Sequence, residues 1–447
     1  FIQILYICLF IHMNIFNITK KNKKNKKIKK NKKNKKLSNI IKISKPINIS
    51  NSKKNAGVQH IIIDSFKEPP SIDNKTHQQK DIRVGELPRT IINPPYNPQQ
   101  IRQAYEVEQI TPIKSKPKVG IIGCYYYSDI QRDFDTWTNH FGLPRKTLVI
   151  NANGVGPASG QNKGWYLELQ LDIQSVYTIC QNCDIHIYLA KSASFLNIKS
   201  AISLANSHKM DVISMSFGSS EMPKQFLNSS SSLESVLTSS KCCYLASTGD
   251  SSFPSYPALN PNVLAIGGTT LNLDLNEGSG IVTRLSEKTW NSAGAGYSNI
   301  YPKPKYQNGI QSITKNKRAI PDISGISNPE TGVYVYCSKY NVGTNWYHVG
   351  GTSLSCPLTA GLIANSLIIR FNNSKGNLTT VANLSNDVHK IIYDRYKLNT
   401  TTFYTLLFYD VEEGLRDNGY KPGSTYDIPT GLGVPLYGKL ANYLGNF

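Results

Sequence analysis

The sequence predicts an α/β fold in which a mostly parallel β-sheet carries helices on both faces. Short apolar runs with the length of buried strands alternate along the chain with segments of helical character. This alternation is typical of strand–helix–strand units, whose helices cover both faces of a parallel sheet. The strand-like runs lie at residues 119–124, 185–189, 211–216, 243–247 and 263–267.

A glycine-rich segment around Ser353 is the part of the chain most informative about function. It reads Gly350-Gly351-Thr352-Ser353-Leu354-Ser355-Cys356-Pro357 and continues into small and apolar residues. Glycines let the backbone turn sharply, and proline is compatible with the first turn of a helix. We therefore expect Ser353 at the start of a helix, where free N–H groups stabilise a developing oxyanion. A glycine-rich loop capped by serine or threonine is the simpler alternative.

A serine hydroxyl needs a base before it can act as a nucleophile. The histidines of the expected folded part are His140, His186, His208, His348 and His389. None has the small-residue, glycine-flanked setting expected of a catalytic histidine. His348, five residues before the serine, is more typical of a packed or exposed loop.

Glu168 and Asp172 offer another base. On a helix, residues four positions apart lie on one face, close enough to share a proton. On a strand they would lie about 13 Å apart. The alternation of leucines and polar residues from 167 to 173 predicts a strand. The residues alone leave both possibilities open.

Taken in order, these motifs resemble those of the sedolisin, or serine-carboxyl peptidase, family. Glu168 and Asp172 lie in ELQLD, Asp250 lies in STGDSS, and Ser353 lies in GGTSLSCP. Other matching stretches are residues 214–221, 256–258, 265–270, 290–298 and 321–324. The likeness covers roughly residues 94–447. It implies a subtilisin-like fold with Glu168 on a helix.

The resemblance also implies a role for each of these residues. Ser353 would be the nucleophile, Glu168 its general base, and Asp172 the residue that orients Glu168. Asp250 would help to form the oxyanion hole, which a carboxyl can do only while protonated, so we expect activity at acidic pH. Histidine would be mostly protonated there and could not act as a base.

The chain departs from the family pattern around Asp250, where Thr248 and Ser252 replace the usual serine and glycine. Both replacements are small, so we expect only a modest change in the loop. Two alternatives remain open at this point. One is a histidine-dependent subtilisin-like peptidase, and the other is an inactive homologue that binds peptides without cleaving them.

The C-terminal region resembles the calcium site of the same family. By that resemblance Asp410 and Asp427 would supply carboxylates, and Val411, Gly423 and Thr425 would supply backbone carbonyls to one structural Ca²⁺. Calcium prefers such hard oxygen ligands. Thr425 replaces the usual glycine, although a carbonyl ligand survives that change. The alternative is an acidic turn without metal.

The net charge of +21 is concentrated at one end of the chain and does not indicate a nucleic-acid-binding protein. Residues 1–63 hold 16 lysines and neither arginine nor any acidic residue. The run from Lys20 to Lys36 contains only lysine, asparagine and isoleucine, which is typical of disorder and lacks aromatic groups that stack on bases. We expect no specific nucleic-acid partner.

We expect three segments. Residues 1–19 form an apolar leader, which is a signal sequence, the remnant of a membrane anchor or a translation artefact. Residues 20–92 form a Lys/Asn-rich disordered tract with a truncated pro-region, and residues 93–447 form the peptidase domain with its calcium loop. The chain starts at Phe1 rather than at methionine, as a fragment would. Membrane association is expected only if the leader is a true anchor.

The cysteines and the N-glycosylation motifs provide information about the cellular compartment of the protein. The pair Cys180 and Cys183 lacks the second pair of a zinc finger, and it would form a disulfide only in an oxidising compartment. N-glycosylation motifs start at Asn228, Asn372, Asn377, Asn383 and Asn399. We expect a monomeric, peptide-cleaving protein that is secreted or lies in a lysosome-like acidic vesicle.

Overall fold

The computed structural model describes residues 57–58, 61–66, 68, 89–397, 404–414 and 419–447. All of them belong to one unit, which extends from Ile49 to Phe447. The apolar leader expected at residues 1–19 and the lysine run from Lys20 to Lys36 lie outside the described residues.

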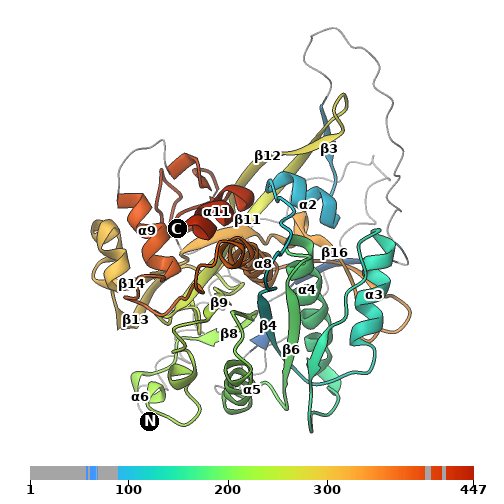
Figure 1. Cartoon of the computed structure of the whole chain (residues 1–447), viewed down its shortest axis with the longest axis horizontal. Coiled ribbons are helices and arrows are strands. Elements are labelled where there is room, and N and C mark those ends of the chain that lie inside the picture. Colours follow the sequence, from blue (N-terminus) through green and yellow to red (C-terminus); the bar gives the residue numbers. More distant parts are fainter. Residues whose placement is uncertain (1–56, 59–60, 67, 69–88, 398–403, 415–418) are drawn as a thin grey trace, which may run out of the picture. The chain divides into compact units, whose positions relative to one another are not determined.

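Among the described residues, a sheet of nine strands forms the centre of this unit (Figure 1). Its strands are β3 (Arg89–Ile92), β4 (Lys118–Cys124), β5 (Val149–Asn151), β6 (Asp184–Ala190), β7 (Val212–Met215), β9 (Cys243–Ser247), β11 (Val263–Asn276), β12 (Ile281–Thr289) and β15 (Ile323–Ile326). The main path runs β12-β11-β9-β7-β4-β6-β5, and β15 and β3 also pair with β11. The pairings are parallel except where β12 and β3 meet β11. The mostly parallel sheet that the apolar runs predicted is confirmed.

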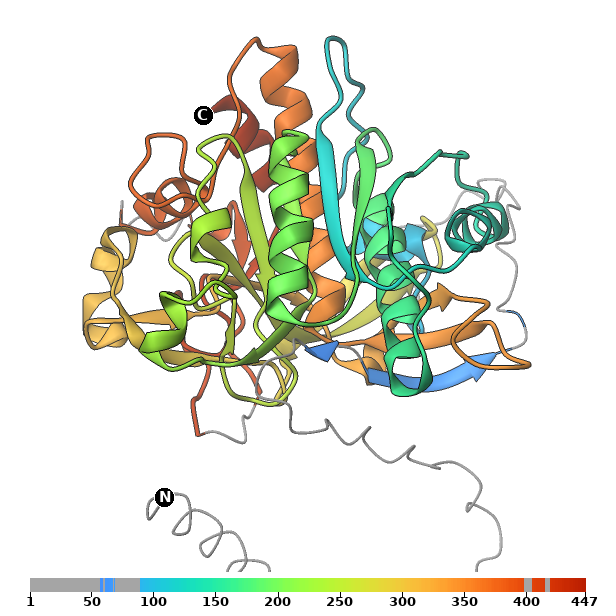
Figure 2. The same cartoon turned by 90° about the horizontal axis from the view of Figure 1, so that it is seen from below.

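Helices cover both faces of the sheet, as predicted. The longer helices are α2 (Pro98–Ala104), α3 (Ile130–His140), α4 (Gly164–Ile179), α5 (Phe195–Ser207), α8 (Thr352–Asn372), α9 (Val388–Lys397) and α11 (Tyr437–Asn446). Because successive side chains of a strand point to opposite faces, β4 serves two cores. Ile121 packs in the core that holds α4 and α8, whereas Ile122 packs in the core that holds α5. Figures 1 and 2 show α4 beside α8, with α5 across the sheet from them.

Smaller elements surround this centre. Three-stranded sheets join β1 (Gly57–Val58), β8 (Phe217–Ser220) and β10 (Ser255–Tyr256), and also β16 (Val333–Tyr336), β17 (Trp346–Gly350) and β2 (Ile61–Phe66). Two-stranded sheets pair β13 (Gly296–Pro302) with β14 (Lys317–Ile320), and β18 (Phe408–Tyr409) with β19 (Val434–Pro435). Short helical turns are α6 (Lys224–Leu227), α7 (Gln311–Thr314), η1 (Gly160–Lys163), η2 (Glu234–Val236), η3 (Lys305–Ile310) and η4 (Pro329–Thr331).

Helix α4 explains why periodicity pointed to a strand for residues 167–173. Every residue of α4 is buried, so apolar and polar side chains need not occupy opposite faces. The polar ones find partners inside the protein: Gln170 Nε2 donates to Tyr127 Oη at 2.6 Å, and Gln174 Nε2 donates to the Tyr336 carbonyl at 2.9 Å. The strand interpretation is wrong, and the helix implied by the family resemblance is confirmed.

Pro357 lies deeper in helix α8 (Thr352–Asn372) than the sequence suggested. The helix starts at Thr352, so Pro357 lies in its second turn rather than its first. Proline has no N–H to donate to the carbonyl oxygen of Ser353, four residues earlier. Of the described helices, α8 alone is long and apolar enough to cross a membrane, and its apolar stretch is entirely buried in the protein.

The two buried helices approach each other closely at Gly361. A methyl group at this glycine would lie 2.7 Å from Ile179 Cβ and 3.0 Å from the Val176 carbonyl oxygen of α4. Farther along α8, Asn365 Nδ2 donates to the Ile179 carbonyl at 3.2 Å. A larger residue at 361 would therefore push α4 and α8 apart.

Candidate active site

Ser353 is the second residue of α8 and is fully buried. The helix is preceded by Gly351, whose φ of +116° is strained for any residue with a Cβ. The hydroxyl of Ser353 donates to the Ser216 carbonyl oxygen at 3.4 Å. The sequence-predicted helix start is therefore present, with the serine held against the junction of β7 and β8.

Glu168 and Asp172 lie one turn apart on α4, and each is only 1% exposed. Burial raises the pKa of Asp172 well above its usual value, and the negative charge of Glu168 raises it further. A hydrogen bond of 2.5 Å from Ser216 Oγ to Asp172 Oδ1 opposes that rise. The two carboxyl groups thus form an interacting pair in a water-poor environment.

Asp250 lies in the loop that follows β9 and is tied to the start of α8. Its Oδ1 accepts hydrogen bonds from the backbone N–H and the hydroxyl of Thr352, both at 2.8 Å. The preceding Gly249 has a φ of +105° and donates its N–H to Thr352 Oγ1 at 3.1 Å. The candidate oxyanion residue therefore contacts the residue next to Ser353.

The two departures from the family pattern leave this loop ordered. Thr248 is fully buried, and its carbonyl packs so tightly on Gly294 that a methyl group there would lie 2.0 Å from its oxygen. Ser252 adopts a left-handed backbone with φ of +65° and donates its hydroxyl to the Asn291 carbonyl at 2.9 Å. A non-glycine residue thus takes up a conformation that glycine adopts most readily.

Two strands from the expected pro-region lie along the edges of this site. Val58 of β1 pairs antiparallel with Phe217 of β8, which directly follows Ser216. Ile61 of β2 pairs antiparallel with Gly350 of β17, three residues before Ser353. In the segment 20–92, where we expected a Lys/Asn-rich disordered tract and a truncated pro-region, residues 57–58, 61–66 and 89–92 form β1, β2 and β3. Strands β8 and β17 thus each pair with an extended segment of the chain's own backbone close to the serine.

Three of the described histidines, His208, His348 and His389, contact groups other than Ser353. His348 is not in a loop but lies buried on β17, where its Nε2 accepts the Gly332 N–H at 3.1 Å. His208 Nδ1 lies 3.0 Å from the hydroxyl of Tyr188, and His389 lies in a separate ionic cluster described below. The paired carboxyl groups of α4 are the better candidates for a base.

The proposed calcium ligands gather around the loop from Gly423 to Asp427. Asp410 Oδ2 accepts the Thr425 N–H at 2.6 Å, and Asp427 Oδ2 accepts the Gly423 N–H at 3.0 Å. Thr425 has a φ of +64°, a left-handed backbone conformation that glycine adopts most readily. Val411, the remaining candidate, is fully buried.

The electrostatics of this loop fit a bound cation. Burial raises the pKa of Asp427 to about 7, and the negative charge of Asp410 contributes to the rise. A divalent cation between the two carboxylates would offset both effects. The described residues hold no cluster of three or more acidic, histidine or cysteine side chains, so carbonyls and water would have to complete the coordination.

Comparison with known proteins identifies the family. The model of the subtilase family matches residues 155–389, more than half of the chain, and this range includes Glu168, Asp172, Asp250 and Ser353. The chain belongs to the subtilase family.

Its relatives place this subtilase in the sedolisin branch. It is 28% identical to kumamolisin of Bacillus sp. (strain MN-32), over 66% of this chain and 53% of kumamolisin. It is 31% identical to tripeptidyl-peptidase 1 of Dictyostelium discoideum, over 43% of this chain and 30% of that protein. The chain thus spans about half or less of the length of these curated relatives.

A solved structure supports the subtilisin-like fold. Pseudomonas sedolisin, a serine-carboxyl proteinase complexed with two molecules of pseudo-iodotyrostatin, matches with a TM-score of 0.63 at 23% identity. The match covers 80% of this chain and 99% of that one. The predicted fold class and the sedolisin resemblance are both confirmed.

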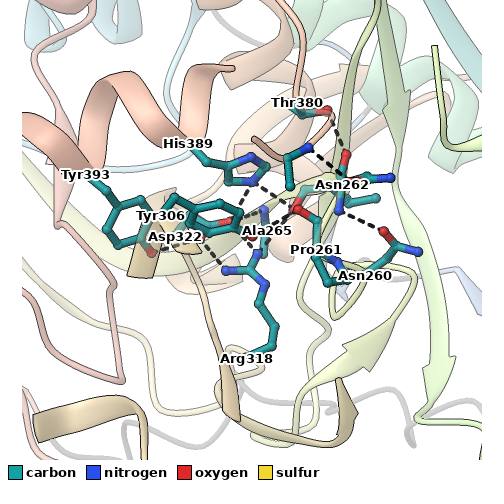
Figure 3. Close-up of polar contacts among 12 residues, drawn as sticks. Asn260, Pro261, Asn262, Ala265, Tyr306, Arg318, Asp322, Thr380, His389 and Tyr393 are labelled. Carbon is teal, nitrogen blue, oxygen red and sulfur yellow. Dashed lines mark hydrogen bonds and ion pairs between the residues drawn. The ribbon is translucent and has the colours of Figure 1, made fainter. Parts of the chain in front are cut away.

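The structure of this subtilase also contains a buried ionic cluster whose role the sequence did not reveal (Figure 3). The guanidinium of Arg318 donates to both carboxylate oxygens of Asp322 at 2.6 Å. His389 lies between two carboxylates, with Nε2 3.4 Å from Asp322 and Nδ1 3.0 Å from Asp387. All four side chains are fully buried. The signal in the sequence was an arginine four residues before an aspartate inside an otherwise apolar stretch.

Neighbouring groups complete the cluster and connect it to the central sheet. Asp322 Oδ2 accepts the Ala265 N–H of β11 at 2.8 Å, and its Oδ1 accepts the Tyr393 hydroxyl of α9 at 2.8 Å. The ring of Tyr306 stacks on His389 at 4.4 Å between centroids. The cluster therefore joins β11, β14 and α9 in the core.

The pKa values of Asp322 and His389 depend on the opposite charges that surround them. Burial alone would raise the pKa of Asp322, but the positive charges of Arg318 and His389 lower it well below its usual value. Burial alone would lower the pKa of His389, but the charges of Asp387 and Asp322 raise it to about 9. Arg318, Asp322 and His389 therefore stay ionised through the acidic and neutral range.

We expect this cluster to lose its stabilising effect as the pH rises through about 9, when His389 loses its proton. A histidine with a raised pKa contributes its full stabilisation below its unfolded pKa near 6.5, and a rise to about 9 corresponds to about 3 kcal/mol. Asp322 has a lowered pKa, so its contribution is present above about pH 4 and declines only as the pH falls further.

Urea unfolding of the wild-type protein and of His389→Gln near pH 6 and near pH 10 measures this effect. Between these values the wild-type protein should lose about 3 kcal/mol more than the variant, which has no proton to release. Parallel losses in the two proteins would contradict the assignment.

Proposed function

We propose that this subtilase is a serine-carboxyl peptidase that hydrolyses peptide bonds at acidic pH. The observation that carries the proposal is that α4 packs against α8, and that Ser216 contacts both Ser353 of α8 and Asp172 of α4. Ser353 lies in the first turn of α8, and the buried Glu168–Asp172 pair lies on the neighbouring α4. Asp250 is hydrogen-bonded to Thr352, which directly precedes the serine. A nucleophile, a carboxylate base and an acid for the oxyanion are what acyl transfer requires.

The proposed reaction begins when the Ser353 hydroxyl turns from the Ser216 carbonyl toward Glu168. Glu168 takes the proton as the oxygen attacks the substrate carbonyl, and later returns it to the leaving amine. Asp172 shares charge and proton with Glu168 and holds it in position. Protonated Asp250 and the N–H groups at the start of α8 stabilise the oxyanion.

A peptide substrate would bind in an extended conformation. The chain's own β1 and β2 already pair with β8 and β17, at Phe217 and Gly350, which supports binding of a substrate as an added strand. A substrate would have to displace these two strands from the same edges. The proposal covers both cleavage within chains and release of N-terminal tripeptides, the second being the activity named in the Dictyostelium relative.

The chemistry indicates where such an enzyme would work. Asp250 can donate a hydrogen bond to the oxyanion only while it is protonated, and acidic pH or a pKa raised by its surroundings favours that form. We therefore propose an acidic setting, either outside the cell or in a lysosome-like vesicle.

We further propose that one structural Ca²⁺ is held by the carboxylates of Asp410 and Asp427 and by carbonyls of Val411, Gly423 and Thr425. The raised pKa of Asp427 supports this, because a cation would relieve the cost of burying that charge near Asp410. When bound, the ion would fix the C-terminal loop rather than take part in the reaction.

Two substitutions test the catalytic proposal in a peptide-hydrolysis assay near pH 4. Ser353→Ala should abolish turnover, and Glu168→Gln should lower kcat by about 10² to 10⁴-fold, the range for loss of a general base. His348→Gln is the matched control. This histidine is buried and lies five residues before the serine, but it accepts a hydrogen bond from the Gly332 N–H. Loss of activity in His348→Gln with retention in Glu168→Gln would instead favour a histidine-dependent enzyme.

Calcium is tested by stability, independently of activity. Removal of calcium with EGTA near pH 7 should lower the melting temperature, since an ion present at a hundred times its Kd stabilises by about 2.7 kcal/mol. Protonation of Asp427 competes with the metal, so the effect should shrink below about pH 7. Asp427→Asn should melt earlier and no longer respond to EGTA. An EGTA response unchanged in that variant would refute the site.

A further inference from the structure

Ser216 lies at the point where the chain leaves the central sheet. It is the single residue between β7, which ends at Met215, and β8, which begins at Phe217. These two strands belong to different sheets, and both are fixed by neighbours on either side. The side chain of Ser216 is only 1% exposed, so its position is set by the protein rather than by solvent.

Ser216 contacts both Ser353 and Asp172, and it uses a different atom for each contact. Its backbone carbonyl accepts the hydroxyl proton of Ser353 at 3.4 Å, and its own hydroxyl donates to Asp172 Oδ1 at 2.5 Å. The second bond is a short one to a buried carboxyl group, a type that contributes more than a bond between neutral groups.

We propose that Ser216 is a positioning residue of the active site, whose hydroxyl fixes one oxygen of Asp172 so that the other faces Glu168. This inference rests on the proposed function. Ser216 would not touch the substrate through its side chain and would act only through Asp172. Its backbone carbonyl would hold the Ser353 hydroxyl until a substrate arrives.

The pH dependence of the site should report this role. The titratable groups that face Asp172 are Glu168 on its own helix and Cys356 on α8. Burial raises the pKa of Cys356 to about 12, and the nearby carboxyl groups add to the rise, so its thiol stays neutral in the working range. The acidic limb of the pH profile then reflects the Glu168–Asp172 pair as a unit.

The hydroxyl of Ser216 favours the ionised pair, because it donates a hydrogen bond to a carboxylate. Without that bond the pair holds its protons more tightly, and a higher pH is needed to free the base. Removal of the hydroxyl should therefore shift the acidic limb of kcat toward neutral pH and misplace Glu168.

The experiment compares Ser216→Ala, Ser216→Cys and Ser214→Ala with the wild-type protein in acid peptide hydrolysis across the pH range. Ser216→Ala should lower kcat about ten- to a hundredfold, with little change in KM and with the acidic limb moved upward. Ser216→Cys keeps a weaker donor of similar size and should fall between Ser216→Ala and the wild-type protein. Ser214→Ala is the matched control, since Ser214 is buried on β7 but contacts Cys356 Sγ at 3.6 Å instead of Asp172.

Each outcome supports or overturns the role of Ser216. A wild-type pH profile and kcat in Ser216→Ala would refute it while leaving the proposed peptidase activity intact. Equal losses in Ser216→Ala and Ser214→Ala, without a shift in the acidic limb, would show that only packing was disturbed and would also refute it. If the wild-type protein were no more active than Ser353→Ala, the proposed function would fail and this inference with it.

Discussion

The site depends on the packing of two buried helices, α4 and α8. Helix α4 carries Glu168 and Asp172, and Ser353 lies in the first turn of α8. The separation of the two helices therefore sets the distances between the serine and the two carboxyl groups. Gly361 permits that separation, because even a methyl group there would lie 2.7 Å from Ile179 Cβ. Packed protein interiors do not absorb such overlaps without moving a neighbour. Displacements of about 1 Å can cost a hundredfold in rate.

The interior of the protein holds two kinds of charged cluster, and their difference is informative. In the Arg318–Asp322–His389 cluster opposite charges meet, and the pKa of Asp322 is lowered so that it stays ionised. In the Glu168–Asp172 pair, burial and then the like charge of Glu168 raise the pKa of Asp172. The first arrangement suits a structural role in acid. The second keeps a proton available within the pair, which suits a base that must accept and return one.

Much of this arrangement could be predicted from the sequence, and the misses have physical causes. The strands of the parallel sheet were found because buried strands are short apolar runs. The hydrophobic periodicity of α4 did not predict a helix, because the helix is buried on all sides. Only the resemblance to the family motifs predicted it. The start of α8 was predicted, but Pro357 was placed one turn too early because prolines are more common in first turns. The proposed role of Ser216 could not be predicted from the sequence, since it depends on contacts with residues 44 and 137 positions away.

The spacing of α4 and α8 is the proposed condition for activity. Its most direct test is the kcat for acid peptide hydrolysis by Gly361→Ala. Gly376→Ala is the control, because a methyl group at that glycine meets nothing within 4 Å. We expect Gly361→Ala to lose more than about tenfold in kcat and to unfold about 1–3 kcal/mol more easily. Gly376→Ala should match the wild-type protein. Full kcat in Gly361→Ala would contradict the account, because the helices could then separate without disturbing the site.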